Sequence, residues 1–441
     1  MFELVEEHYL TDYKYHKSAL FAAQSTLFIR LSAFPLLIKK VSLLPLTLQK
    51  NPQRLKNKLM NRIDMNDLGM AKTIPIKRSR IKANKYHLIL SILLFSFTNH
   101  TKIANSCTTS GIPRNINDKI DAYVRKTLTD HGVPGAALAI IKDGKIVHQK
   151  NYGYANLEHE VLISKQSIFR LYSLSKPIVT VSVFKLIEQG KLDLEEEISL
   201  YLKDLPEAWN TIKIKHLLSY SSGLPDMGQP YLEVKDLTEE AIKARIYPLP
   251  LNFEKGERFE YSQTNFWFLQ TILEKVSNSK LSEIVLNHQF PDRTESVFFS
   301  CDVRDIIKHR TTAYFPFLKG QLTIELPYYT GEYSLAASGL HLTLQDFMDW
   351  DRRFHQSQLI SETSKQKMWA SFPYSNSAEE FAYGWGKYAT NIGDAYGFTG
   401  SGSTMYRTFP TKNISIIFLA NGFTTHYDLG NMANQLAGMI H

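Results

Sequence analysis

Cysteine is scarce in this sequence: of its 441 residues, only Cys107 and Cys301 are cysteines. No C-x-x-C or H-E-x-x-H motif is present, so neither a zinc ligand set nor a disulfide framework can be assigned. The G-x-x-x-x-G-K loop that cradles nucleotide phosphates is also missing. We therefore expect no metal and no cofactor.

Most of the chain lacks an excess of positive charge, although the formal net charge of the whole chain is +8. Residues 1–106 contain 17 of the 51 lysines and arginines but only 6 of the 43 acidic residues. Residues 107–441 therefore carry 34 basic and 37 acidic side chains. A nucleic-acid-binding face needs an excess of basic residues on the folded part. We expect no nucleic-acid partner.

The segment from Met70 is typical of a bacterial secretory signal. A basic stretch from Lys72 to Lys85 precedes the apolar run 88–97, and Ala104-Asn105-Ser106 offers a small-residue cleavage site. The apolar run is too short to cross a bilayer, which takes about 20 apolar residues. We expect a periplasmic or secreted protein.

This signal-like segment divides the chain into three parts. Residues 1–69 form an N-terminal extension that we do not expect in the mature protein, residues 70–106 form the signal-like segment, and residues 107–441 form the folded domain. Cys107 stands where a lipid-modified cysteine would follow the cleavage site, although the preceding residues fit a lipobox poorly. Membrane association is expected only if Cys107 carries a lipid.

Both ends of the folded domain predict a helix and β-strands. Apolar residues at helical spacing between 116 and 128 precede two apolar runs joined by Asp143-Gly144, a strong two-residue hairpin turn. Near the other end, three strands between 396 and 419 are followed by a helix over 427–440. Residues 180–385 read as a helix-rich insert. The fold class is therefore α+β, an α/β sandwich in which an antiparallel sheet is flanked by the N- and C-terminal helices.

The most informative motif is S-x-x-K at Ser173 and Lys176. A lysine one helical turn from a serine can take its proton, provided that the lysine is neutral. The motif also begins at four other serines, so context must choose among the five occurrences: Ser79, Ser173, Ser182, Ser277 and Ser364.

Only Ser173 precedes a predicted buried helix that carries proline in its first turn, Pro177, and a glycine stop, Gly190. The start of that helix would offer partial positive charge and backbone N–H groups to a developing oxyanion. We predict that Ser173 is the nucleophile of a serine acyl-transfer enzyme.

Residues 114–441 also resemble the serine β-lactamase and penicillin-binding-protein superfamily. The likeness is greatest to its class C β-lactamase-like, esterase and D-aminopeptidase branch. It rests on Phe169-Arg170-Leu171-Tyr172-Ser173-Leu174-Ser175-Lys176, the run 190–194, the segment 214–226 that contains Ser221-Ser222-Gly223-Leu224-Pro225-Asp226, and the run 256–262 that ends in Tyr261-Ser262. The resemblance implies a β-lactamase/transpeptidase-like fold.

The resemblance also implies roles for individual residues. Ser173 would be the nucleophile, Lys176 the general base, and Tyr261 the relay that protonates the leaving group. Backbone N–H groups of Ser173 and Ser401 would form the oxyanion hole. Desolvation should lower the pKa of Lys176 from about 10.4, and a nearby cation should bring the pKa of Tyr261 down from about 10.

Two motif positions depart from the family pattern. Gln263 replaces the usual asparagine of Tyr-x-Asn, and we expect its amide to bond to substrate or to Lys176. In the third motif, Phe398-Thr399-Gly400-Ser401, Phe398 replaces the usual lysine or histidine that binds a substrate carboxylate. Arg407 is the nearby candidate to replace that cation.

Three functions remain open from the sequence. The first is a serine hydrolase that acts on small-molecule esters, amides or peptides through an acyl-enzyme. The second is a penicillin-recognising β-lactamase or D,D-peptidase, and the third is a catalytically silent binding or sensor protein of the same fold. The intact Ser173, Lys176 and Tyr261 argue against the third. Neither His216 nor His341 has the spacing of a catalytic triad, so we expect structural roles for both.

The signal-like segment predicts the N-terminus of the mature protein. N-terminal sequencing of protein from the native host should find a chain that begins at or near Cys107, because the basic, apolar and small-residue segments follow Met70 in the order of a cleaved signal. A soluble chain that begins at Met1 and retains residues 86–97 would contradict export by this segment.

Overall fold

The computed structural model describes residues 115–228, 238–293, 295–318, 321–324, 330–423 and 428–441. All of these belong to one compact unit, Pro113–His441. The N-terminal extension, the signal-like segment, Cys107 and the S-x-x-K motif at Ser79 lie outside the described residues. No described helix is both long and apolar enough to cross a membrane.

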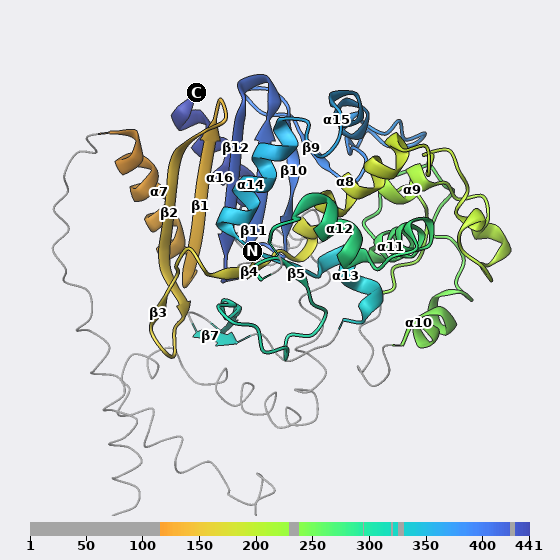
Figure 1. Cartoon of the computed structure of the whole chain (residues 1–441), viewed down its shortest axis with the longest axis horizontal. Helices are drawn as coiled ribbons and strands as arrows, with labels where there is room; N and C mark the ends of the chain where they lie inside the picture. The colour runs from red at the N-terminus through yellow and green to blue at the C-terminus, as the bar shows by residue number, and fades with distance from the viewer. Residues whose placement is uncertain (1–114, 229–237, 294, 319–320, 325–329, 424–427) are drawn as a thin grey trace, which may run out of the picture. The chain divides into compact units, whose positions relative to one another are not determined.

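A seven-stranded sheet forms the centre of the domain (Figure 1). Its strand order is β3-β2-β1-β12-β11-β10-β9, and every neighbouring pair is antiparallel. In that order the strands are Val161–Leu162, Lys145–Asn156, Gly135–Lys142, Ile414–Ala420, Thr404–Phe409, Ala395–Gly400 and Gly386–Tyr388. The two ends of the domain thus meet at the β1–β12 pair, and the predicted antiparallel sheet is confirmed.

Side-chain alternation along the central strands separates two apolar clusters. Leu138 of β1 and Phe418 of β12 belong to an outer cluster, whereas Ala139 and Leu419 belong to an inner cluster. Helices α7 (Ile116–Asp130) and α16 (Leu429–Ile440) complete the outer cluster. The inner cluster is covered by α8 (Ser175–Glu188) and α14 (Leu344–His355). The result is a three-layer sandwich of helices, sheet and helices.

Helix α8 is buried on nearly all sides, which explains why its sequence is apolar without a polar stripe. It ends where the sequence predicts: Gln189 caps it, and Gly190 follows with a φ of 64°. The N–H of Lys191 then donates to the carbonyl of Leu186, which completes the turn. This helix fixes the position of the S-x-x-K motif between the sheet and the insert.

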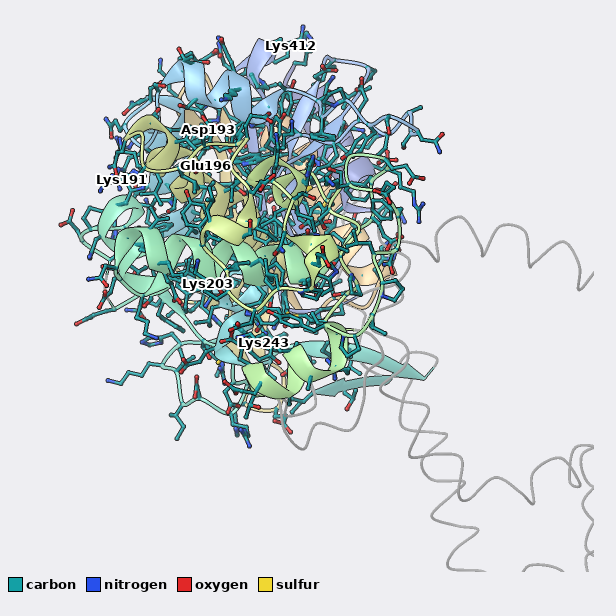
Figure 2. The ribbon with its side chains drawn as sticks, turned by 90° about the vertical axis from the view of Figure 1, so that its right-hand side faces the viewer. Lys191, Asp193, Glu196, Lys203, Lys243 and Lys412 are labelled. Carbon is teal, nitrogen blue, oxygen red and sulfur yellow. The ribbon has the colours of Figure 1, made fainter. Side chains whose placement is uncertain are left out.

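The insert is rich in helices, as the sequence predicts, and α11 contains the amphipathic run at 265–276. Its helices are α9 (Ile214–Leu218), α10 (Glu239–Ile246), α11 (Gln263–Ser277), α12 (Leu281–Gln289), α13 (Leu335–Ser338) and α15 (Glu362–Trp369). Short 3₁₀ turns occur at Tyr172–Leu174, Ile198–Leu200, Glu207–Trp209, Glu332–Ser334 and Pro410–Lys412. Figure 2 views the helical side, where the labelled charged side chains include both signs, such as Lys191 and Asp193.

The insert is not entirely helical, which the sequence did not reveal. A second sheet of three strands, β4-β8-β5, is formed by Ile168–Arg170, Leu340–Thr343 and Phe298–Phe299. A separate hairpin pairs β6 (Tyr314–Leu318) with β7 (Gln321–Ile324). Strands of two to five residues leave too short an alternation to recognise. The small sheet matters to the site, because β4 leads directly into the segment that carries Ser173.

Candidate active site

Ser173 lies in the single 3₁₀ turn Tyr172–Leu174 that joins β4 to α8. It therefore precedes the helix by two residues, as the sequence predicts. Neither its backbone N–H nor that of Ser401 donates to another described group. Both donors are consequently available to a ligand, which an oxyanion hole requires.

Tyr172 supports the Ser173 backbone in an uncommon conformation. Its φ is 52°, a left-handed value that a non-glycine residue adopts only at an energetic cost of about 1–3 kcal/mol. The ring is buried, packs edge-on against Phe423 at a centroid distance of 4.9 Å, and lies 4.8 Å from the guanidinium carbon of Arg170. These contacts hold the turn that presents the serine.

Lys176 is completely buried, one turn after Ser173. Its Nζ lies 3.2 Å from Ser173 Oγ and donates to the carbonyl of Ala337 at 2.7 Å. The rings of Tyr261 and Phe266 cover the amine at 5.0 and 5.5 Å. Desolvation lowers the pKa of Lys176 well below its ordinary value, although the charge of Asp226 acts in the opposite direction. The amine therefore favours its neutral, proton-accepting form.

Tyr261 completes the contact, because its hydroxyl lies 2.8 Å from Ser173 Oγ. Its ionisation differs from the sequence expectation. Burial raises the pKa of Tyr261, and the hydrogen bond between Tyr261 and Ser173 only partly offsets that increase. The expected lowering would need a neighbouring cation, and a neutral Lys176 does not supply one. Tyr261 thus remains a neutral hydroxyl that can both accept and donate a proton.

Gln263 contacts Tyr261 rather than Lys176. Its Nε2 lies 3.5 Å from the Tyr261 hydroxyl, at the outer limit of a hydrogen bond, whereas no bond to Lys176 forms. One consistent chain of donors follows: Gln263 to Tyr261, Tyr261 to Ser173, Ser173 to the lone pair of Lys176, and Lys176 to a carbonyl. In this chain the longer amide side chain orients the tyrosine hydroxyl toward Ser173.

Phe398 faces the same contact from strand β10. Its ring is 9% exposed, stacks on Tyr261 at 6.3 Å and meets Phe381 edge-on at 6.2 Å. The position that holds a cation in the family pattern is therefore an apolar wall. Strand β9 pairs only with Ala395–Gly397, so within the described chain the edge of β10 beside Phe398 has no strand partner.

Thr399, Gly400 and Ser401 follow along this edge. Thr399 is half-buried, while Ser401 is exposed and adopts a φ of 44° at the turn into β11. Gly400 lies against the chain just before Ser173, because an added Cβ would be 2.0 Å from the carbonyl oxygen of Leu171. Thr404 Oγ1 donates to that same oxygen at 2.8 Å. Gly400 therefore sets the separation between β10 and the Ser173 turn.

The candidate replacement cation, Arg407, lies on the wrong face of the sheet, and that expectation was wrong. Arg407 pairs with Ile416, a member of the outer cluster, and its guanidinium carbon sits 3.6 Å from the centroid of the Tyr388 ring. Neighbouring strand residues alternate between faces, so Tyr406 points inward and Arg407 outward.

Asp226 is a site residue to which the sequence reading gave no role. Its Oδ1 accepts the backbone N–H of Gln263 at 3.0 Å and that of Gly228 at 3.1 Å. Burial raises its pKa, and it interacts electrostatically with Lys176 and Tyr261. The only available signal was its place after the Ser-Ser-Gly-Leu-Pro run. Ala337 was also missed, because a backbone carbonyl leaves no mark on a sequence.

The alternative serines and the two histidines have structural surroundings. Ser182 lies within α8, Ser277 ends α11 and Ser364 lies within α15. His216 accepts the N–H of Lys213, and His341 contacts the carbonyl of Gly339. Burial lowers the pKa of His216 to about 4 and that of His341 to about 3, so both rings are neutral. In the described part of the chain, no three His, Cys, Asp or Glu residues gather as metal ligands.

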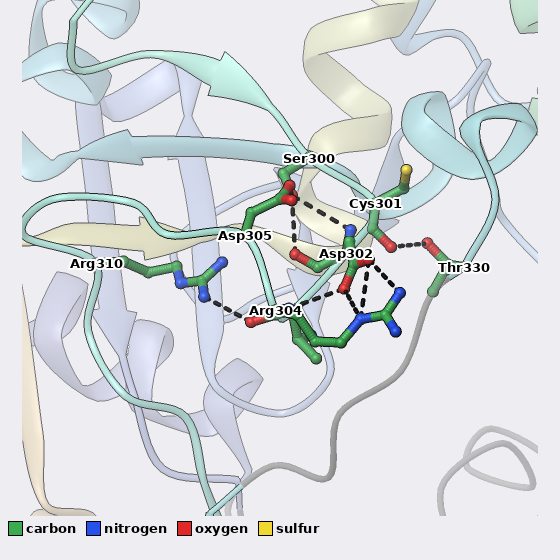
Figure 3. Close-up of polar contacts among 8 residues, drawn as sticks. Ser300, Cys301, Asp302, Arg304, Asp305, Arg310 and Thr330 are labelled. Atoms are coloured by element: carbon green, nitrogen blue, oxygen red, sulfur yellow. Dashed lines mark hydrogen bonds and ion pairs between the residues drawn. The ribbon is translucent and has the colours of Figure 1, made fainter.

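Tyr172 also lines a cavity of about 530 Å³, and none of the predicted catalytic side chains lines it. Figure 3 shows the loop along its rim. There Ser300 donates to Asp305 at 2.6 Å, Arg304 binds both oxygens of Asp302, and Arg310 donates to the carbonyl of Val303. These groups satisfy one another within the loop, so we place the site at Ser173 and not in this cavity.

Comparison with protein families agrees with this geometry. The family model described as Beta-lactamase matches residues 120–438. The chain belongs to the β-lactamase family. The match includes the whole seven-stranded sheet and the three residues Ser173, Lys176 and Tyr261.

Individual relatives are distant. The putative penicillin-binding protein PbpX of Bacillus subtilis is 24% identical over 334 residues, which cover 74% of this chain and 78% of PbpX. Protein flp of Staphylococcus aureus is 27% identical over 176 residues, or 38% of this chain. The chain spans only 35% of the length of flp.

Solved structures show the same fold. An octameric penicillin-binding protein homologue from Pyrococcus abyssi superposes with a TM-score of 0.62 at 23% identity, over 73% of this chain and 76% of its own. A D-amino acid amidase from Ochrobactrum anthropi gives a TM-score of 0.62 at 16% identity, over 74% and 99%. The predicted β-lactamase/transpeptidase-like fold is thereby confirmed.

The close approach at Gly400 can be tested by adding one methyl group. Gly400→Ala should push β10 away from Leu171 and displace the Ser173 turn, reducing the rate of covalent labelling by fluorophosphonate on the order of 10²-fold. Gly438→Ala in α16 is the control, because its added Cβ meets nothing within 4 Å. A wild-type labelling rate for Gly400→Ala would contradict the proposed spacing.

Proposed function

We propose that this protein is a secreted or periplasmic serine hydrolase that forms an acyl-enzyme on Ser173 and hydrolyses small esters or amides. One observation carries the proposal: a fully buried Lys176 amine and a neutral Tyr261 hydroxyl both contact Ser173 Oγ, at 3.2 and 2.8 Å. A binding protein has no use for a neutralised lysine beside a serine hydroxyl.

The proposed acylation step follows from these contacts. Ser173 gives its proton to the neutral amine of Lys176 while Oγ attacks the substrate carbonyl carbon. The oxygen of the tetrahedral intermediate accepts the backbone N–H groups of Ser173 and Ser401. Tyr261 then protonates the leaving group, and the proton on Lys176 replaces the one that Tyr261 gave up. The net proton movement is from Ser173 to the leaving group.

Deacylation uses the same groups in reverse. Water gives a proton to the neutral amine of Lys176 and attacks the ester carbonyl that joins the acyl group to Ser173. The carbon–oxygen bond to Ser173 breaks, and Oγ recovers a proton. Water and substrate acyl group are thereby converted into a free acid, with the protein unchanged.

A second candidate function is penicillin recognition, because the relative PbpX is named a putative penicillin-binding protein. The apolar wall at Phe398 weighs against it, since the family pattern places a cation there for a substrate carboxylate. Intact-mass analysis after separate treatment with a fluorophosphonate and a penicillin distinguishes the two. Labelling by the first reagent alone supports the ester or amide hydrolase.

The nucleophile assignment predicts the result of removing one hydroxyl. Ser173→Ala should abolish covalent labelling and turnover, while Ser277→Ala should leave both intact, because Ser277 lies at the end of α11 opposite to Gln263. Lys176→Ala and Tyr261→Phe should each slow acylation on the order of 10²-fold or more. Labelling that persists in Ser173→Ala would refute the assignment.

The buried lysine predicts the pH dependence of acylation. As the pH falls through the lowered pKa of Lys176, the amine binds a proton and can no longer accept one from Ser173. The rate of fluorophosphonate labelling should therefore fall on the acid side of a midpoint well below 10.5, the ordinary lysine value. Lys176→Arg should remove this limb along with most of the activity. A midpoint at the ordinary value would contradict a desolvated base.

Phe398 predicts a preference among substrates. The protein should hydrolyse short aryl esters such as 4-nitrophenyl acetate and turn over benzylpenicillin weakly or not at all, because a charge-assisted contact of about 1.5–3 kcal/mol is missing. Phe398→Lys should increase penicillin acylation by roughly tenfold or more, with Phe398→Leu as the apolar control. Faster turnover of benzylpenicillin than of the ester by the native protein would refute this substrate inference, although Ser173 could remain the nucleophile.

A further inference from the structure

Gln270 is a buried polar side chain on an apolar stretch of helix α11. Its neighbours along the helix include Phe268 and Leu269, which belong to the inner cluster. A buried amide is costly unless both of its ends form hydrogen bonds. Both ends of this amide bond to the backbone of one segment, because Oε1 accepts the N–H of Ala336 at 3.0 Å and Nε2 donates to the carbonyl of Glu332 at 2.9 Å.

The segment that Gln270 holds is too short to keep its own shape. It consists of the 3₁₀ turn Glu332–Ser334 and α13, which has four residues. A single helical turn is unstable alone, because it fixes several residues for few hydrogen bonds. The first N–H groups of α13 also need an acceptor. Ser334 at the N-cap does not supply one, since its hydroxyl donates to the carbonyl of Gly331 at 2.8 Å. Gln270 supplies it from α11.

The same segment presents the carbonyl that binds the amine of Lys176. Ala337 directly follows Ala336, and its oxygen accepts a hydrogen bond from Lys176 Nζ at 2.7 Å. The chain just after α13 is held from α8, where Ser175 Oγ accepts the N–H of Leu340 at 3.1 Å. The Ala337 carbonyl therefore lies between two anchors, one on α11 and one on α8.

The direction of this carbonyl limits where the amine of Lys176 points. In the proposed acylation step the amine accepts a proton through its lone pair, which must face Ser173 Oγ at 3.2 Å. One N–H of the same amine is meanwhile held by the Ala337 carbonyl. Because the lone pair and the N–H groups are fixed relative to one another, a shift of the carbonyl turns the lone pair away from Ser173.

We propose that Gln270 positions the amine of Lys176 by fixing the carbonyl of Ala337. The proposal rests on the hydrolase function proposed above and adds a positioning residue to it. Gln270 follows Gln263, the first residue of α11, by about two helical turns. Helix α11 thus orients both proton-transfer groups of the site, Tyr261 through Gln263 and Lys176 through Gln270.

The test measures the rate constant of fluorophosphonate labelling in the full-length chain. Gln270→Met keeps the length of the side chain and removes both bonds, so it should slow labelling by roughly tenfold because the proton acceptor is misplaced. If Gln270 acts through Lys176, the same substitution in Lys176→Ala protein should slow the residual labelling by about twofold or less. The final labelled fraction, read by intact mass, reports the amount of competent protein separately from the rate constant.

Tyr152→Phe is the matched control for the loss of buried hydrogen bonds. The Tyr152 hydroxyl lies 2.8 Å from Asp121 and 3.0 Å from His148, and its ring belongs to the outer cluster on the other face of the sheet. This variant should lose stability but keep the wild-type rate constant within about twofold. Equal slowing by Tyr152→Phe and Gln270→Met would overturn the proposal, because any loss of buried bonds would then explain the effect.

Equal slowing by Gln270→Met in the wild-type and Lys176→Ala backgrounds would also overturn it, since Gln270 would then act independently of the lysine. If Gln270→Met leaves no labelled protein, Gln270→Asn, which keeps the amide and shortens its reach by a methylene, is judged by the same comparison. Failure of the hydrolase function gives a different result. Wild-type protein that is not labelled, or that is labelled equally fast without Lys176, refutes the hydrolase mechanism and the positioning role with it, whereas equal slowing in the two backgrounds refutes the positioning role alone.

Discussion

The burial of the Lys176 amine is the constraint on which the site depends. Removing an ammonium group from water is costly, so a lysine enclosed by Tyr261, Phe266 and the Ala337 carbonyl lowers that cost by losing its proton. The same enclosure raises the pKa of Tyr261 and keeps its hydroxyl neutral. One desolvated pocket therefore places a neutral amine and a neutral tyrosine hydroxyl on either side of Ser173.

The backbone around Ser173 is also held in place by specific contacts. Tyr172 accepts a left-handed φ because its ring is fixed by Phe423 and Arg170. Gly400 lets β10 approach the Leu171 carbonyl more closely than any side chain would allow. Ser173 is consequently positioned by the small sheet and the large sheet together, and the absence of a side chain at Gly400 sets the separation between β10 and the Ser173 turn.

The lining of the site differs from the family pattern in a consistent direction. Phe398 removes a cation from one wall, and Arg407, the nearest basic residue along the strand, points to the opposite face of the sheet. Asp226 and Gln263 meanwhile present acceptors. A wall without positive charge lacks the charge-assisted contact that the family pattern offers to a substrate carboxylate.

The sequence alone determined the elements whose signals are local. The helix that follows Ser173, the Asp143-Gly144 hairpin and the strands near the C-terminus were predictable because periodicity, turn residues and caps act over a few residues. The S-x-x-K motif identified Ser173 and Lys176 as the candidate pair by the same local logic. Only tertiary structure decided the rest, because it depends on contacts between segments distant in the chain. Which elements pack together decides the contact of Lys176 with the Ala337 carbonyl, that of Gln263 with Tyr261, the bond from the Gln263 N–H to Asp226 and the outward direction of Arg407. Burial, which governs the pKa of Lys176 and Tyr261, exists only once those elements have packed.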